Sequence, residues 1–200
     1  MIATPEAVLD FWFGAPGSAA EIAARQRPLW FAKSAANDQI VTARFAETLV
    51  TAGQGELDGW AASPRGRLAM IVVLDQFPHH IHRDHGQSFA YDALSLALAL
   101  EMIQRGEDAQ VTPIERVFVY LPLEHAESMA MQDLSVALYE KLAREAAAAE
   151  RGLFDGFLDY ARKHRDVVAR FGRFPHRNEL LGRPSTAEEI EFLKQPGSRF

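Results

Sequence analysis

Four histidines lie between positions 79 and 85, close behind the side chains of Asp75 and Gln76. Proline clashes with the carbonyl four residues earlier in a helix, so Pro78 predicts a helix end near Phe77 and a histidine-bearing turn after it. Neutral imidazoles bind zinc and other transition metals well. The chain has no cysteine and no His-Glu-x-x-His spacing, which favours a solvated turn with surface histidines over a metal site. The candidate ligands are His79, His80, His82 and His85.

A carboxylate and an imidazole stand next to each other at Glu124 and His125, directly after Pro122. His125 follows Phe118 by seven residues, so a continuing helix would turn it inward. Such a pair suits acid–base catalysis or hydrogen bonding to a ligand in a cleft. The alternative is a buried pair that bonds the backbone groups freed by the proline. The sequence leaves both interpretations open.

Polar residues of the C-terminal third form two further groups. His164 falls on an apolar helical stripe between Phe157 and Phe171, which favours a hydrogen-bonded core histidine over a site residue. Residues 162–183 then carry seven basic and two acidic side chains, and the basic ones are mostly arginine. Arginine suits planar, bidentate pairing, either with an anionic ligand or with carboxylates of the chain itself. The acidic composition favours the second alternative.

Helices must position these groups. Proline follows a capping hydroxyl residue at Thr4, Ser63 and Thr112, a pattern typical of helix starts. Capping boxes begin at Ser18, Thr112 and Ser185. The only strand-like run, residues 70–74, lies downstream of a Ser-Pro helix start and predicts a buried helix instead. We therefore expect an all-α fold of about eight to ten helices with short connections.

Composition restricts the class of protein further. The chain has 200 residues, 48% apolar and 24% charged, and no Ser/Gly/Pro-rich linker, which predicts a single domain over residues 1–200. The net charge of −6 argues against a nucleic-acid partner, and no apolar run is long enough to span a membrane. Without a secretory signal, we expect a cytoplasmic protein. Glycine-rich nucleotide loops, nucleophile elbows and EF-hand loops are absent, so the sequence implies no cofactor. It does not indicate an oligomeric state.

Six stretches together resemble a bacterial family of uncharacterised proteins, the domain of unknown function family 924. They are VLDFWFG (8–14), LDQFPHHIHR (74–83), FAYD (89–92), VYLPLEHAE (119–127), HRDVVARFGRFPHRNELLGR (164–183) and FLKQPGSRF (192–200). The resemblance implies a tetratricopeptide-like fold, in which antiparallel helix pairs stack in a right-handed array. It implies no established activity, cofactor or catalytic residue. The family usually has Arg-Asn where this chain has His79-His80, and Ser where it has Ala126, which argues against a shared metal site on these histidines.

We expect the family-like polar residues to converge on one face or groove of the array. They are Asp75, Gln76, Glu124, His125, His164, Arg165, Asp166, Arg173, His176, Arg177 and Asn178. The first hypothesis is a binding module for an anionic small molecule or acidic peptide, with Trp12, Trp30 and Phe31 beside the basic segment. The second is an acid–base or metal-assisted hydrolase that uses Glu124 and His125 with His164 or His176. The third is a purely structural polar network, with function in a partner surface elsewhere.

Overall fold

The computed structural model describes residues 1–199, and these form helices joined by short turns, with no β-strand. The α-helices are α1 (Pro5–Phe13), α2 (Ala19–Phe31), α3 (Ala35–Gly53), α4 (Pro64–Ile71), α5 (Phe77–Ile81), α6 (Asp92–Gln104), α7 (Pro113–Glu124), α8 (Met129–Glu145), α9 (Arg151–Phe171) and α10 (Ala187–Leu193). A π-helical turn (Val72–Gln76) and four 3₁₀ turns (Asp58–Ala62, Gly86–Phe89, Glu107–Gln110 and Pro175–Arg177) complete them. The predicted all-α class is confirmed.

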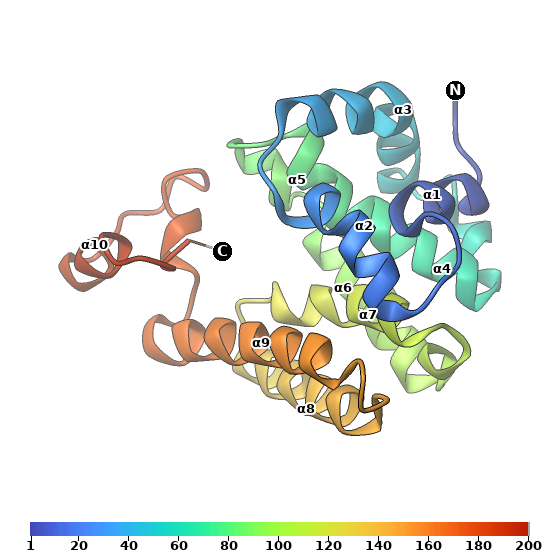
Figure 1. Cartoon of the computed structure of the whole chain (residues 1–200). Coiled ribbons are helices and arrows are strands. Elements are labelled where there is room, and N and C mark those ends of the chain that lie inside the picture. The colour runs from blue at the N-terminus through green and yellow to red at the C-terminus, as the bar shows by residue number, and fades with distance from the viewer. Residues whose placement is uncertain (200) are drawn as a thin grey trace.

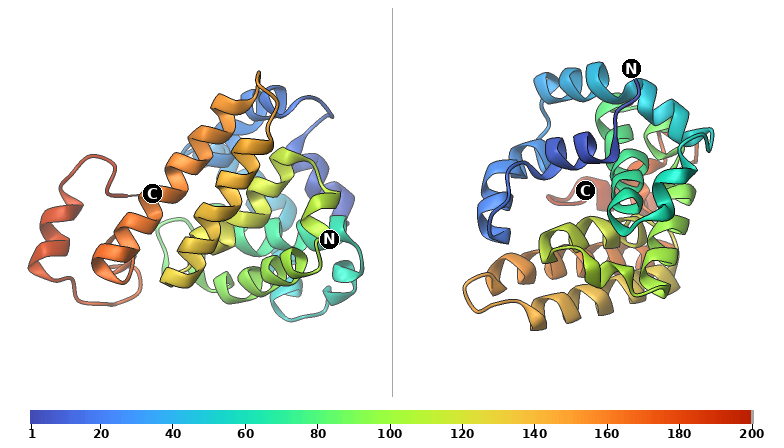
Figure 2. Two further views of the ribbon diagram at one scale, coloured as in Figure 1. Left: turned by 90° about the horizontal axis from the view of Figure 1, so that it is seen from below. Right: turned by 90° about the vertical axis from the view of Figure 1, so that its right-hand side faces the viewer.

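The helices pack in layers (Figure 1). Helices α8 and α9 run side by side in opposite directions along one side of the molecule, α6 and α7 lie next to them, and α1–α5 lie beyond, with α5 beside α3. The short helix α10 stands apart from these layers, beyond the end of α9 (Figure 2). This layering agrees with an array of packed helices, while its right-handed, tetratricopeptide-like twist stays a prediction. None of the helices within residues 1–199 combines the length and apolar character needed to cross a membrane.

Side chains at the helix starts explain why the elements begin where they do. The capping boxes at Ser18 and Thr112 are confirmed. The third box is shifted by one residue from the predicted Ser185, since Thr186 is the residue that caps α10. Its Oγ1 accepts from the Glu189 amide at 3.2 Å, and the Glu189 carboxylate accepts from the Thr186 amide at 2.7 Å.

The helical run that carries Asp75 does not end near Phe77, so that prediction was wrong. The run continues from α4 through the π-helical turn into α5, with the Phe77 amide donating to the Val72 carbonyl five residues back. The wider π turn accommodates Pro78 without the break that a regular helix would need. The prediction that residues 70–74 form a buried helical segment is confirmed.

Aromatic rings fill the centre of the molecule. Trp12 and Trp30 pack against Phe118, with ring centroids 5.6 and 4.7 Å apart. Both tryptophans are buried. They are core residues of the N-terminal layers and do not flank the basic segment as expected.

Candidate functional site

A buried carboxylate holds an imidazole at the junction of the π turn, α6 and α7. Asp75 is fully buried, and its Oδ1 lies 3.1 Å from Nδ1 of His125. The Gln76 amide donates to Asp75 Oδ2 at 2.6 Å, and the Ser95 hydroxyl donates to Oδ1 at 3.3 Å. Burial opposes the charge of Asp75, but His125, His79 and Gln76 more than offset it and hold the pKa of Asp75 below its usual range.

His125 is the cationic member of this Asp75–His125 pair. Burial opposes its charge, but the Asp75 carboxylate outweighs burial and raises the pKa of His125. The side chain of His125 is 18% exposed, whereas that of Asp75 is 0% exposed. Because Nδ1 is engaged by Asp75, Nε2 is the nitrogen that His125 can offer to a ligand.

A second carboxylate–imidazole pair, Glu124 and His164, lies close to the first. Oε1 of Glu124 lies 3.0 Å from Nδ1 of His164, which also lies 2.9 Å from the Tyr160 carbonyl. A carbonyl oxygen only accepts, so His164 donates from Nδ1. Burial, together with the Asp75 charge, raises the pKa of Glu124 to about 8, and burial lowers that of His164 to about 3. The Glu124–His164 pair is therefore neutral at pH 7.

Three imidazoles lie in a row across the two pairs. The ring centroids of His79 and His125 are 5.7 Å apart, and those of His125 and His164 are 6.4 Å apart. Burial and the charge on His125 lower the pKa of His79 to about 3. The row thus has one charged ring between two neutral ones.

An arginine–carboxylate pair lies beside His125. Nη1 of Arg177 donates to Oδ2 of Asp92 at 3.1 Å. The guanidinium is flanked by the rings of Phe89 and Phe174, whose centroids are 4.5 and 4.7 Å from its Cζ. Burial raises the pKa of Asp92 to about 6, although Arg177 opposes the shift. Within the described residues, Arg177 Nε and Asp92 Oδ1 are buried and have no hydrogen-bond partner.

His125, Asp92 and Arg177 line a cavity of about 300 Å³ between α6, α7 and the segment after α9, which we call the α6–α7 pocket. Its polar lining comes from Asp92, His125, Glu127 and Arg177, and its apolar lining from Phe89, Ala93, Leu96, Pro122, Ala126 and Leu181. Its walls thus combine apolar surface with a few charged groups, as is typical of small-molecule sites.

Residues 8–197 match the family model described as a bacterial protein of unknown function, DUF924. The chain belongs to this family. A solved structure of a protein of unknown function from Agrobacterium tumefaciens is similar to it, with 37% sequence identity and a TM-score of 0.74. The similarity covers 88% of this chain and 99% of that one. Among curated proteins, none matches the chain.

In this DUF924 member, only part of the expected set converges. His125 and Arg177 line the α6–α7 pocket, and Asp75, Gln76, Glu124 and His164 lie behind it. Asn178 is buried and binds Ser185 and Arg183, which holds the segment after α9 together. His176 packs 5.7 Å from the Phe174 ring, and burial lowers its pKa to about 4.

Arg165 and Arg173 lie away from the pocket. Arg165 binds Asp133 on α8 at 2.6 Å, and Arg173 binds Glu189 on α10 at 2.7 Å. Both therefore tie elements together. The arginines of the basic segment are largely paired with the chain's own carboxylates, and their ion-pair partners among the described residues include neither Glu124 nor Asp75.

The four clustered histidines point to different places. His80, on α5, lies 2.9 Å from Asp38 and packs against Trp12, while its neighbour His79 faces His125. His82 and His85 lie in the turn that follows α5. No group of three His, Asp or Glu in residues 1–199 has the geometry to hold a metal ion.

Sequence reasoning missed Asp92, Phe89 and Glu127 as pocket residues. All three lie in family-like stretches, FAYD (89–92) and VYLPLEHAE (119–127), but they have no chemical pattern of their own there. The aromatic rings that flank Arg177 of the basic segment are Phe89 and Phe174, whereas the expected Trp12 and Trp30 lie in the core and Phe31 packs against Phe157.

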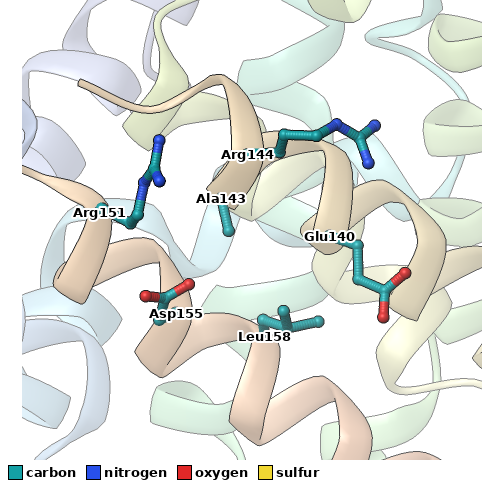
Figure 3. Close-up of a pocket in the computed structure, with 6 residues that line it drawn as sticks. All are labelled: Glu140, Ala143, Arg144, Arg151, Asp155 and Leu158. Carbon is teal, nitrogen blue, oxygen red and sulfur yellow. The ribbon is translucent and has the colours of Figure 1, made fainter. Parts of the chain in front are cut away.

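A second hollow of about 270 Å³ lies between α8 and α9 (Figure 3). Its charged residues are Glu140, Arg144, Arg151 and Asp155, and all of them are exposed. It contains no buried polar side chain that could select a ligand. The α6–α7 pocket is the stronger candidate.

Proposed function

We propose that the α6–α7 pocket binds a small anionic ligand, which makes the chain a binding protein. The observation that carries the proposal is the Asp75–His125 pair, because a buried carboxylate holds a cationic imidazole at the wall of a cavity. An imidazole fixed at Nδ1 offers the N–H of its Nε2 to an acceptor.

Arg177 supports the same ligand chemistry. Its guanidinium lines the pocket between two aromatic rings, which restrict its orientation and contribute cation–π attraction. A planar, oriented guanidinium is well suited to a carboxylate. Together, His125 and Arg177 give the pocket two cationic hydrogen-bond donors.

A purely structural network explains the buried residues less completely. The Glu124–His164 pair is sealed and neutral, as a structural network requires. The Asp75–His125 pair is instead charged and lies at a cavity, an arrangement that costs desolvation energy and gains nothing for packing.

Thermal unfolding with small carboxylates, amino acids and inorganic phosphate tests the proposal. At a ligand concentration of 100 times Kd, binding adds about 2.7 kcal/mol, which raises the Tm of a chain of this size by about 5–10 °C. The shift should be retained in Arg165→Ala, a control that removes a partly buried arginine outside the pocket, and lost in His125→Gln. No shift with any compound, or equal shifts in His125→Gln, would overturn the proposal.

Acid–base catalysis is the second candidate, and the same Asp75–His125 geometry favours it. A protonated His125 backed by a buried carboxylate could donate a proton to a leaving group in the pocket. The sequence suggested Glu124 as the carboxylate partner of His125. In the structure Glu124 pairs with His164 behind the pocket, and Asp75 is the carboxylate that pairs with His125. Release of nitrophenol from nitrophenyl esters and phosphates by the wild type, but not by His125→Gln, would support catalysis, and no release would exclude these reactions.

The net charge of −6 supports a small-molecule partner over a nucleic acid. The lack of cysteine is compatible with the cytoplasm, which we infer as the compartment. The pocket residues need no cofactor for binding.

A further inference from the structure

The α6–α7 pocket carries charges of both signs, and this bears on the proposed anionic ligand. His125 and Arg177 are cationic, while Asp92 and Glu127 are carboxylates in the same lining. A simple anion bound to Arg177 would lie close to Asp92, which pairs with that arginine at 3.1 Å. Like charges at such a distance repel each other, so an anion alone is a poor match for this wall.

The two carboxylates differ in how fully they are engaged. Glu127 accepts from the Phe174 amide at 2.8 Å and from two nitrogens of Arg183 at 2.5 and 2.8 Å. The side-chain carboxylate of Asp92 accepts one hydrogen bond, from Arg177, and its Oδ1 has no partner within residues 1–199. Asp92 is therefore the carboxylate with acceptor capacity left for a ligand.

Arg177 has the complementary capacity. Arg177 is only 7% exposed, and its Nε has no hydrogen-bond partner among the described residues. Buried donors and acceptors without partners destabilise a protein, and ligand groups of the opposite kind can satisfy them after small side-chain rotations. A ligand could therefore supply an acceptor for Arg177 Nε and a donor for Asp92 Oδ1.

The remaining wall limits the rest of the ligand. Phe89, Leu96 and Pro122 supply apolar surface on the 3₁₀ turn, α6 and α7. The volume of about 300 Å³ lies at the lower end of the range for ligand sites, so the apolar part of the ligand must be short.

We propose that the α6–α7 pocket binds a zwitterion, an α-amino acid with a short apolar side chain. The carboxylate is held by Arg177 and His125, the ammonium group by Asp92, and the side chain packs against the apolar wall. This inference rests on the proposed function and adds the cationic group that anion binding alone does not require.

Calorimetric titration at pH 7.5 with three compounds separates the two proposals. The probes are leucine, N-acetyl-leucine, which lacks the ammonium group, and leucine amide, which lacks the carboxylate. We expect leucine to bind and each analogue to bind at least tenfold more weakly. N-acetyl-leucine that binds as tightly as leucine would overturn the zwitterion while anion binding stands. Leucine amide that binds as tightly would overturn the anion site, and no binding of any probe would overturn both.

Asp92→Asn tests the ammonium contact while preserving the shape of the side chain. The variant should lose most of its preference for leucine over N-acetyl-leucine, whereas Arg165→Ala should keep it. A preference that survives in a folded Asp92→Asn variant would contradict the assignment of Asp92. The analogue series on the wild type gives its answer even if this variant does not fold.

Discussion

At the residue scale, two carboxylate–imidazole pairs are neighbours, since the His125 ring of one contacts the His164 ring of the other, yet one pair is charged and the other is neutral. Asp75 and His125 are both charged, whereas Glu124 and His164 are both neutral at pH 7. The difference follows from surroundings, because Asp75 accepts additional hydrogen bonds while Glu124 is buried near the Asp75 charge. Environments that separate the pKa values of like groups are a common property of functional sites.

Replacing Asp75 by Asn should lower the pKa of His125, because the variant removes the charge that stabilises the imidazolium. An NMR pH titration of the His125 ring protons measures this. Glu124→Gln is the matched control, since it exchanges a neutral group for another neutral group and should change the pKa of His125 much less. An unchanged His125 titration in Asp75→Asn would show that the pair is not the source of the charge.

Ligand affinity should fall as the pH decreases below about 6, where Asp92 gains a proton. The charged groups that act on Asp92 are Arg177, His125 and Asp75. The two cations keep their charge on acidification, and the pKa of Asp75 lies below its usual range, so Asp92 dominates the change. Titration of leucine at pH 5 to 7.5 should show a loss of up to about tenfold per pH unit below the pKa. A pH-independent affinity in the wild type would contradict this role, and Asp92→Asn should show the smaller dependence.

At the element scale, the sequence predicts helix starts well and helix irregularities poorly. Capping residues act within one turn, so Ser18 and Thr112 could be identified from spacing alone. Ser185 and Thr186 each have a glutamate three residues later, so spacing alone does not distinguish them; in the structure Glu189 bonds back to the Thr186 amide, whereas Glu188 pairs with Arg170. Pro78 predicts an irregularity in the helix, but a proline alone does not distinguish a helix end from a π turn that lets the helix continue.

The 3₁₀ turn Gly86–Phe89 supports the pocket through a close backbone contact. A Cβ added at Gly86 would lie 2.6 Å from the Leu180 carbonyl oxygen, next to the pocket residue Leu181. Gly86→Ala should therefore displace that segment, destabilise the fold by about 1–3 kcal/mol and weaken leucine binding.

Gly156→Ala, in α9, is the matched control, because nothing lies within 4 Å of its added Cβ. It should stabilise the fold by about 0.5–1 kcal/mol and leave binding unchanged. Urea unfolding and calorimetry measure both effects. Equal binding by the two variants would mean that the segment around Leu180 does not shape the pocket.

At the scale of the whole molecule, the site combines segments that are distant in sequence. Arg177 and Asp92 are 85 residues apart, and Asp75 and His125 are 50 apart. Residue types and family-like stretches identified Arg177 of the first pair, and both Asp75 and His125 of the second, as candidate site residues. Asp92 could not be predicted, because its role depends on where α6 lies relative to the segment after α9.

The buried ionisable groups predict how stability depends on pH. Burial lowers the pKa of His79 and His164 to about 3 and that of His176 to about 4, from 6.5. Between about pH 4 and pH 6.5 these histidines are protonated in the unfolded chain but not in the folded one, so the free energy of unfolding rises with pH up to about 6.5. Burial has the opposite consequence for Glu124, whose pKa rises from 4.5 to about 8, because the folded chain then binds the extra proton.

The free energy of unfolding should therefore reach a maximum near pH 6.5 and decline toward pH 8, as ionisation of Glu124 becomes more favourable in the unfolded chain. One proton contributes a slope of up to about 1.4 kcal/mol per pH unit. Glu124→Gln removes that proton, so the variant should keep the rise below pH 6.5 and show a shallower decline above it, to which His125, whose pKa is also raised, still contributes. Urea unfolding at pH 5 to 8.5 measures both profiles. A wild-type profile that is flat above pH 6.5, or a decline that is equally steep in Glu124→Gln, would show that Glu124 is ionised in the folded protein and that the Glu124–His164 pair is not neutral.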